Sequence, residues 1–379
     1  MNFNKKNLGS GRRSFLKLMA ASTAAWMLTP LLNACQKIII PSRALTPTVK
    51  PTASFQQFPS ITPQTLTPTP GQVKNPDVRQ IFLVKTDQRE AGIRAAFTLL
   101  DQNPIQGKTV LLKPNFNSTD PAPASTHPET LRTLVTRLQD MGASDVTLAD
   151  RSGMGHSRNV MQALGIFEMA RDLDFNTLSF EDLTDASDWE LIQPPKSHWQ
   201  NGFPFPRQAL EAGAIVQTCC LKPHRFGGHF TLSLKNSVGM VGKYFGSGGH
   251  NYMNELHNST YQRLMIAETN LAYNPALVVL DGVEAFIDMG PDVGTKVWGN
   301  LILVGKDRIA IDVIGLAALR LLGLKGDAAR GRIRDQEQIS RAMELNLGIT
   351  DLDQIEIITS DEDSREYAGQ IMEVLNRDW

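Results

Sequence analysis

Cysteine is scarce in this chain of 379 residues, and the cysteines present lack the spacing of a metal site. There are three, Cys35, Cys219 and Cys220, and none belongs to a Cys-x-x-Cys pair. An iron–sulfur cluster held by the chain's own cysteines is therefore not expected. Cys219 and Cys220 lie in an apolar run, and we interpret both as buried apolar side chains.

Two motifs of common enzyme classes are also missing. The segment Arg-Ser-Gly-Met-Gly at 151–155 does not match a glycine-rich nucleotide fingerprint. The chain has no Gly-x-Ser-x-Gly motif, so the nucleophile elbow of the α/β-hydrolases is not predicted.

Acidic residues are absent from the first 76 residues, which hold nine of the 38 lysines and arginines. The rest of the chain therefore holds 29 basic and 39 acidic residues, a formal charge of −10 that the overall value of −1 conceals. Nucleic-acid binding is not expected of so acidic a domain, because contacts to phosphates supply most of that affinity.

The N-terminus has the pattern of an export signal. Basic residues precede an apolar run over residues 15–32 that is short for a membrane span. RRSFLK at 12–17 resembles the bacterial twin-arginine signal, and LNAC at 32–35 resembles a lipobox with Cys35 as the acylated residue. These resemblances predict a protein of the bacterial cell envelope, tethered to the outer face of the cytoplasmic membrane. An ordinary cleaved signal or a retained anchor is the alternative.

Residues 36–76 are predicted to be a disordered tether between this signal (residues 1–35) and an α/β domain (residues 77–379). Within 41–76 there are eight prolines, seven threonines and three serines with no periodicity. Such a segment buries too little apolar area to offset the entropy of ordering.

Alternating apolar runs and helical patterns predict a mainly parallel sheet flanked by helices. The length predicts a second lobe or long insertion, with Asp182–Pro206 as the excursion. Thr126 and Glu129 predict a capping box at the start of the helix Pro128–Met141. The predicted strands are Gln80–Val84, Thr109–Leu112, Asp145–Ala149, Ala214–Leu221, Ala276–Leu280, Asn300–Val304 and Gln354–Thr359, and the predicted helices are Glu90–Gln102, Pro128–Met141, Arg158–Arg171, Arg308–Leu322 and Glu362–Leu375.

Polar residues gather in one part of this pattern. All seven histidines lie between His127 and His257, and the segment Leu221–His250 combines three of them with three lysines, one arginine and seven glycines. Imidazoles move protons or bind metals, basic side chains bind anions, and glycine admits a ligand close to the backbone. This composition favours a functional loop, although a solvated surface loop can have it too.

Charged residues follow four of the predicted strands directly: Lys113, Asp150, Lys222 and Asp281. Because open parallel sheets bind ligands outside the carboxyl ends of their strands, these positions predict a single cleft.

Seven motifs in order resemble the domain of unknown function 362 family, whose members are sometimes labelled uncharacterised iron–sulfur-centre proteins. The similarity spans residues 78–325 and implies little about activity. Some members carry a separate cysteine module that this chain lacks. The motifs are LKPN at 112–115, THPE at 126–129, LKPH at 221–224, LKNSVG at 234–239, DGVE at 281–284, GP at 290–291 and the aspartates Asp307 and Asp312.

The lactate racemase family offers a weaker resemblance. Its nickel-pincer cofactor is carried on a lysine and bracketed by histidines, and His224, Lys235 and His250 occur here in the same order at similar spacing. The resemblance implies catalytic roles for these three residues, with Lys235 as the covalent anchor and His127 or His156 in the remaining histidine role.

From these patterns we predict ligand-binding residues for a small carboxylate or phosphate, and a possible metal set of His224, His229 and Asp281. The alternatives are lysines at strand ends, loop histidines facing water, and Asp-Gly turn chemistry. The predicted ligand-binding residues are Lys113, Asn115, Asp150, Lys222 and Asn236.

The leading hypothesis is an exported, membrane-tethered protein that binds a small anionic ligand, with or without a metal ion or a preloaded cofactor. A non-catalytic solute-binding lipoprotein and a racemase-like isomerase remain open. The sequence does not decide between an enzyme and a binding protein.

Overall fold

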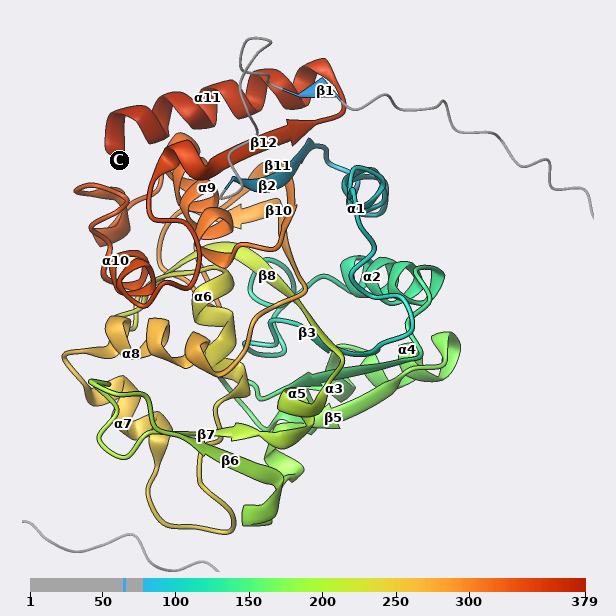
Figure 1. Cartoon of the computed structure of the whole chain (residues 1–379), viewed down its shortest axis with the longest axis vertical. Helices are drawn as coiled ribbons and strands as arrows, with labels where there is room; N and C mark the ends of the chain where they lie inside the picture. The colour runs from blue at the N-terminus through green and yellow to red at the C-terminus, as the bar shows by residue number, and fades with distance from the viewer. Residues whose placement is uncertain (1–63, 66–77) are drawn as a thin grey trace, which may run out of the picture. The chain divides into compact units, whose positions relative to one another are not determined.

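A ten-stranded sheet, mostly parallel, organises the described part of the chain (Figure 1). The computed structural model describes residues 64–65 and 78–379. The strand order is β1-β12-β2-β11-β10-β8-β3-β4-β5, with β9 paired to β8. Every neighbour pair from β10 to β5 is parallel, whereas β11 is antiparallel to both of its neighbours. The predicted fold class is confirmed.

The element bounds are as follows. The strands are β1 (Gln64–Thr65), β2 (Arg79–Lys85), β3 (Thr109–Lys113), β4 (Asp145–Asp150), β5 (Asn176–Ser179), β6 (Trp189–Ile192), β7 (Phe203–Pro206), β8 (Ala214–His224), β9 (His229–Thr231), β10 (Leu277–Phe286), β11 (Lys296–Gly305) and β12 (Ile355–Thr359). The helices are α1 (Arg89–Thr98), α2 (Pro128–Asp140), α3 (Ser157–Ala163), α4 (Ile166–Leu173), α5 (Arg207–Glu211), α6 (Ser233–Asn236), α7 (Tyr252–Asn258), α8 (Gln262–Glu268), α9 (Arg308–Leu321), α10 (Glu337–Glu344) and α11 (Glu362–Asp378).

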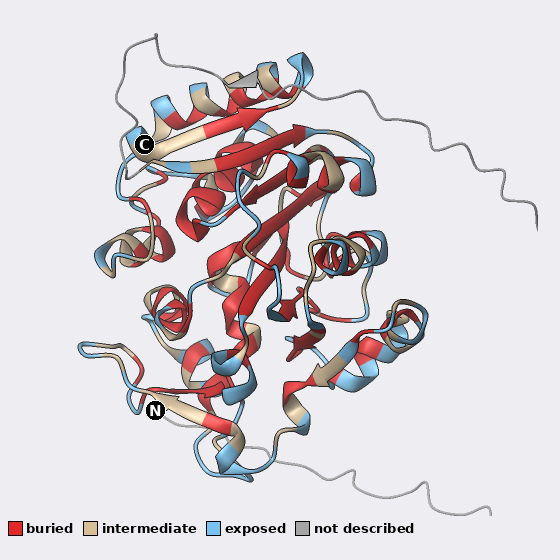
Figure 2. Cartoon of the chain, turned by 45° about the vertical axis from the view of Figure 1, so that its right-hand side comes forward, coloured by how far each residue is buried: buried red, intermediate tan, exposed pale blue. Residues whose placement is uncertain are grey.

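Helices cover both faces of the sheet, and Figure 2 shows the central strands buried between them. One face carries α1, α2 and the α3–α4 pair over an apolar core that includes Leu112 and Leu134. The other face carries α9, α10 and α11 over a second core that includes Leu280 and Ile314. Every residue of β8 and β10 is buried, because both faces of these strands are covered.

The predicted excursion is a small antiparallel hairpin. Strands β6 and β7 pair only with each other, and their aromatic residues pack with α7 and α8 into a third apolar core. Trp189 and Phe205 belong to this core, which lies at the bottom of Figure 1.

Two local predictions were wrong. The helix predicted over Arg158–Arg171 is divided into α3 and α4 at Gly165, whose φ of 71° lies in the left-handed region. The residue that caps α2 is His127, whose Nδ1 accepts from the Glu129 backbone N–H at 3.2 Å. Thr126 instead accepts a hydrogen bond from the Asn115 backbone N–H at 2.8 Å.

The predicted export signal, Cys35 and nearly all of the predicted tether lie outside the described residues. Among the helices that are described, none combines the length and the apolar character needed to cross a membrane.

Candidate functional site

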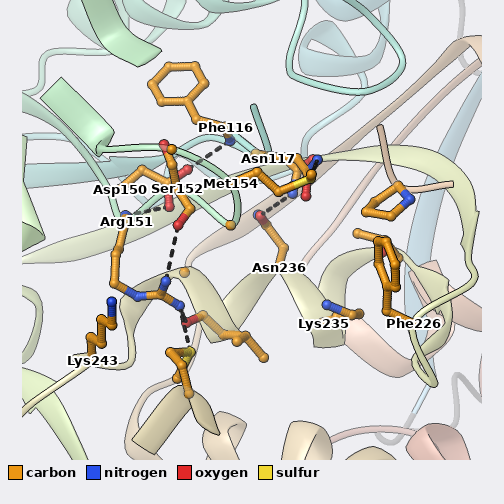
Figure 3. A pocket seen from close by; sticks show the side chains of 18 of the residues that line it. Phe116, Asn117, Asp150, Arg151, Ser152, Met154, Phe226, Lys235, Asn236 and Lys243 are labelled. Carbon is orange, nitrogen blue, oxygen red and sulfur yellow. Dashed lines mark hydrogen bonds between the residues drawn. The ribbon is translucent and has the colours of Figure 1, made fainter. Parts of the chain in front are cut away.

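A cavity of about 630 Å³ opens at the carboxyl ends of β3, β4 and β8 (Figure 3). Lys113, Asp150 and His224 are the last residues of these three strands, and all three line the cavity. The opposite wall comes from α6, α7 and the loop between them, including Lys235, Lys243 and His257. Of the four strand ends predicted to form one cleft, those with Lys113 and Asp150 meet at this edge of the sheet, whereas Lys222 and Asp281 do not line the cavity.

The five predicted ligand-binding residues form one hydrogen-bonded network. The Lys222 ammonium donates to Asn115 Oδ1 at 2.9 Å and also to the carbonyl of Ala124. The Asn115 amide donates to Asn236 Oδ1 at 3.3 Å, and Lys113 donates to the same oxygen at 3.2 Å. Lys113 then pairs with Asp150 Oδ1 at 2.8 Å. The network crosses from β8 through the loop after β3 to α6 and β4.

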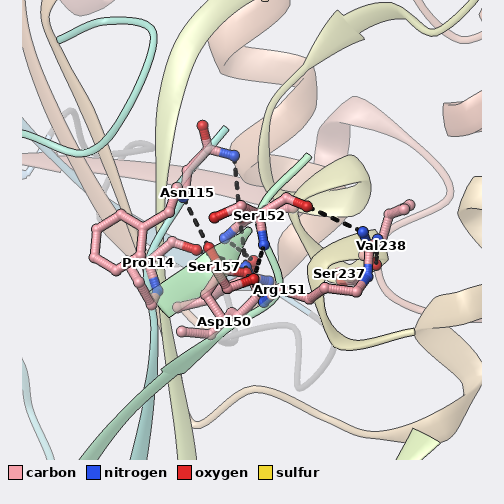
Figure 4. Close-up of polar contacts among 12 residues, drawn as sticks. Pro114, Asn115, Asp150, Arg151, Ser152, Ser157, Ser237 and Val238 are labelled. Carbon is pink, nitrogen blue, oxygen red and sulfur yellow. Dashed lines mark hydrogen bonds and ion pairs between the residues drawn. The ribbon is translucent and has the colours of Figure 1, made fainter. Parts of the chain in front are cut away.

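Asp150 is the anchor of this network (Figure 4). Besides the ion pair with Lys113, it accepts hydrogen bonds from the backbone N–H groups of Phe116 and Arg151, each at 2.8 Å. The pKa of Asp150 is raised above its usual value, because burial outweighs the Lys113 ammonium and the Phe116 N–H, which both lower it. The Asp150 oxygens act as acceptors for Lys113 and for two backbone N–H groups.

Gly239 lets the backbone of the α6–α7 loop close over this pair. A Cβ at Gly239 would overlap Asp150 Oδ1 and stand 2.6 Å from the Lys113 ammonium nitrogen. The Gly239 carbonyl accepts from the Arg151 backbone N–H at 3.0 Å, which joins the loop to the end of β4.

Arg151 is a buried cation held by carbonyl groups rather than by a carboxylate. Its guanidinium donates to the carbonyl oxygens of Val241 at 2.8 Å, Ser152 at 3.1 Å and Val238 at 3.1 Å. Two carboxylates attract the Arg151 charge, Asp150, which also pairs with Lys113, and Glu181, but neither forms an ion pair with Arg151 in the described part of the chain.

Lys235 projects from α6 into the open centre of the cavity, across from Arg151 and Lys243 (Figure 3). Its stem and His224 both pack on Gly228: a Cβ there would lie 2.7 Å from Lys235 Cε and 2.9 Å from His224 Nδ1. Burial, followed by repulsion from Lys222 and Arg151, lowers the pKa of Lys235 to about 7. Burial and the same kind of repulsion hold the pKa of His224 well below its usual value, so its ring is neutral.

Positive charge dominates the cavity. Its lining holds four basic residues, Lys113, Arg151, Lys235 and Lys243, against two carboxylates, Asp150 and Glu181. Lys222 stands directly behind the lining, fully buried, and burial lowers its pKa to about 8. An anion entering this cavity would find unneutralised cations in a partly desolvated site, where their attraction is stronger than in water.

Comparison with known proteins identifies the domain that carries this cavity. The model of a domain of unknown function, DUF362, matches residues 110–317, more than half of the chain. The chain belongs to the DUF362 family. All the lining residues, from Lys113 to Pro291, fall within the DUF362 domain.

Two individual proteins share similarity with the chain. The thylakoid-associated protein sll1697 of Synechocystis sp. is 25% identical over 254 residues, which cover 64% of this chain and 75% of the relative. The lactate racemase apoprotein of Thermoanaerobacterium thermosaccharolyticum aligns with a TM-score of 0.31 and 14% identity over 54% of this chain. The chain spans half the length of that structure.

Four of the predicted site residues of the DUF362 domain lie outside the cavity lining: Lys222, which stands behind it, and His229, His250 and Asp281. His250 is partly exposed, with Nε2 2.5 Å from Glu255 Oε2. His229 is the strand partner of His224 where β8 and β9 pair, and its Nε2 lies 3.8 Å from Asp327 Oδ2. Asp281 accepts hydrogen bonds from Arg89 at 3.0 Å and Thr130 at 2.5 Å.

The predicted metal set is therefore not assembled. Asp281, on β10, is bound by Arg89 and Thr130, whereas His224, on β8, lines the cavity. Within residues 78–379 there is no group of three or more histidine, cysteine or acidic side chains that could hold a metal ion.

The sequence analysis missed Arg151 and His257 as lining residues of the DUF362 domain. Arg151 directly follows Asp150 at the carboxyl end of β4, and this position was the available signal. No local pattern marked His257, because α7 reaches the cavity only through tertiary packing.

Proposed function

We propose that this is an exported, membrane-tethered protein whose DUF362 domain binds a small anion, a carboxylate or a phosphate, in the cavity at the carboxyl ends of β3, β4 and β8. The observation that carries the proposal is the excess of basic side chains there, four against two carboxylates. Of the four, Lys113 and Arg151 are buried, Lys235 is half-buried and Lys243 is exposed. This excess occurs although residues 77–379, which include the domain, carry a formal charge of −10. A local concentration of positive charge on an acidic protein favours a specific anion site over diffuse binding.

Export and tethering are proposed from the twin-arginine-like string at 12–17 and from Cys35 in its lipobox-like setting. The Synechocystis relative is described as thylakoid-associated, which agrees with a membrane location for this chain as well.

Calorimetric titration of the purified full chain with inorganic phosphate and with propionate tests the anion site. We expect saturable binding of at least one of them. The titrations are run at pH 6, where Lys235 is charged because its pKa is about 7. Lys235→Gln then removes a charged donor at the centre of the cavity, and should weaken binding by about 1.5–3 kcal/mol, roughly 10- to 100-fold.

The matched control is Lys108→Gln, because Lys108 is exposed and is not a lining residue of the cavity. Its affinity should equal that of the unchanged protein. Equal losses in the two variants, or failure of both anions to bind, would contradict an anion site in the cavity.

A further inference from the structure

Lys235 differs from the two buried basic residues of the cavity lining in having no partner for its amine, and from the fourth, Lys243, in being half-buried rather than exposed. Lys113 is bound by Asp150 and Asn236, and Arg151 by three backbone carbonyls. Within the described residues the Lys235 amine has no hydrogen-bond or ion-pair partner, and its end faces the open centre of the cavity (Figure 3). An amine placed in this way is available for chemistry with a ligand.

The surroundings of Lys235 favour the neutral amine. The charged side chains that act on it are Lys222 from β8 and Arg151 from the loop after β4, both positive. His224 from β8 and His257 from α7 also face it, and burial lowers the pKa of each ring. No carboxylate among the described residues acts on the Lys235 amine to offset these effects. The free base of the amine is therefore favoured at and above about pH 7, and a free amine is a nucleophile.

We propose that Lys235 forms an imine with the carbonyl carbon of a 2-oxo acid bound in the cavity, an inference that rests on the anion site proposed above. The amine nitrogen bonds to the carbonyl carbon, and one amine proton passes to the carbonyl oxygen to give a carbinolamine. The carbon–oxygen bond then breaks, and the oxygen leaves as water with the second amine proton while the C=N bond forms. No oxidant or reductant is needed.

Neighbouring groups fit the rest of such a ligand. Arg151 and Lys243, across the cavity from Lys235, are placed to attract the carboxylate (Figure 3). Phe226, which is 49% exposed and lines the cavity, offers an apolar surface for the remainder of the ligand. The neutral ring of His224, packed beside the Lys235 stem, can relay the proton that the carbinolamine exchanges.

Reductive trapping tests the imine. The full chain is incubated with pyruvate and cyanoborohydride, and its intact mass and tryptic peptides are measured. We expect one stable pyruvate adduct, located on Lys235. Propionate, which has the carboxylate but no carbonyl, should give no adduct and should slow trapping by pyruvate.

The pH profile adds a second readout. Only the neutral amine reacts, so the trapping rate at Lys235 should rise with pH and level off above about 7, the pKa to which burial lowers this lysine. An exposed lysine with the ordinary value of 10.5 would still be rising there, with a neutral fraction at pH 7 roughly a thousandfold smaller.

Lys235→Arg keeps a basic side chain at this position but cannot form the imine, so it should lose the adduct. If this variant does not fold, the peptide map of the unchanged protein still decides where the adduct lies. Pyruvate binding without an adduct, or adducts spread over surface lysines, would overturn the imine and leave the anion site standing. Failure of phosphate, propionate and pyruvate alike to bind would remove both proposals.

Discussion

Single residues set the geometry of the cavity, and Gly239 is the clearest case. Its backbone crosses the buried Lys113–Asp150 pair so closely that a side chain has no room. Both charged groups are fully buried and held by other bonds, so neither can move aside cheaply.

Gly239→Ala should therefore destabilise the protein by about 1–3 kcal/mol through overpacking, and should weaken phosphate binding. Urea unfolding and calorimetry measure the two effects. Gly248→Ala is the control, because a Cβ there meets nothing within 4 Å. If Gly239→Ala were as stable as Gly248→Ala, the loop would not be closed over the pair in the way described.

At the scale of elements, the short helix α6 presents two cavity residues, Lys235 and Asn236, and depends on α9 for its position. The carboxylate of Asp312, on α9, accepts from the backbone N–H groups of Ser233 at 2.7 Å and Leu234 at 3.0 Å. A helix of four residues is unstable alone, so this contact fixes its start.

Asp312→Ala would leave two buried N–H groups without an acceptor. We expect a loss of roughly 2 to 4 kcal/mol in the free energy of unfolding, from the usual cost of such groups. Anion affinity should fall with it, because Lys235 and Asn236 lose their support. The control is Asp101→Ala, at an exposed position, which should change neither the urea midpoint nor the affinity for anions. If the two variants were equally stable, the role given to Asp312 would be refuted.

At the scale of the whole molecule, the basic N-terminal 76 residues and the acidic remainder are suited to different surroundings. The proposed signal would direct the chain across the membrane, and acyl chains on Cys35 would hold it there, at about 0.8 kcal/mol for each buried CH₂ group.

Replacing Arg12 and Arg13 together by lysine should leave the precursor inside the cell, whereas Cys35→Ser should allow export but release the protein from the membrane fraction. Cell fractionation and immunoblotting measure both outcomes, and Lys5→Gln serves as a control for loss of a single basic residue. Normal export of the double-lysine variant would contradict the twin-arginine route, and a Cys35→Ser protein that stays membrane-bound would contradict acylation.

The strands and the longer helices could be predicted from sequence because their signal is local. Burial on both faces gives β8 and β10 continuous apolar runs, and one-sided burial gives α2 its apolar stripe. The predictions failed where a single backbone angle decided the outcome, as at Gly165, or where two side chains competed for one cap, as with Thr126 and His127.

By itself, the sequence determined the fold class, the strand ends that carry Lys113 and Asp150, and the concentration of basic residues in one segment. Only the tertiary structure decided which of these residues meet. Because β8 lies beside β3, Lys222 contacts Asn115, which is 107 positions away in the sequence. In the same way α6 brings Asn236 to Lys113, which is 123 positions away. His250 and Asp281 have equally suggestive neighbours in sequence, yet they bind Glu255 and Arg89 instead. Local patterns record how each segment is buried, whereas the order of strands in a sheet depends on the packing of the whole chain.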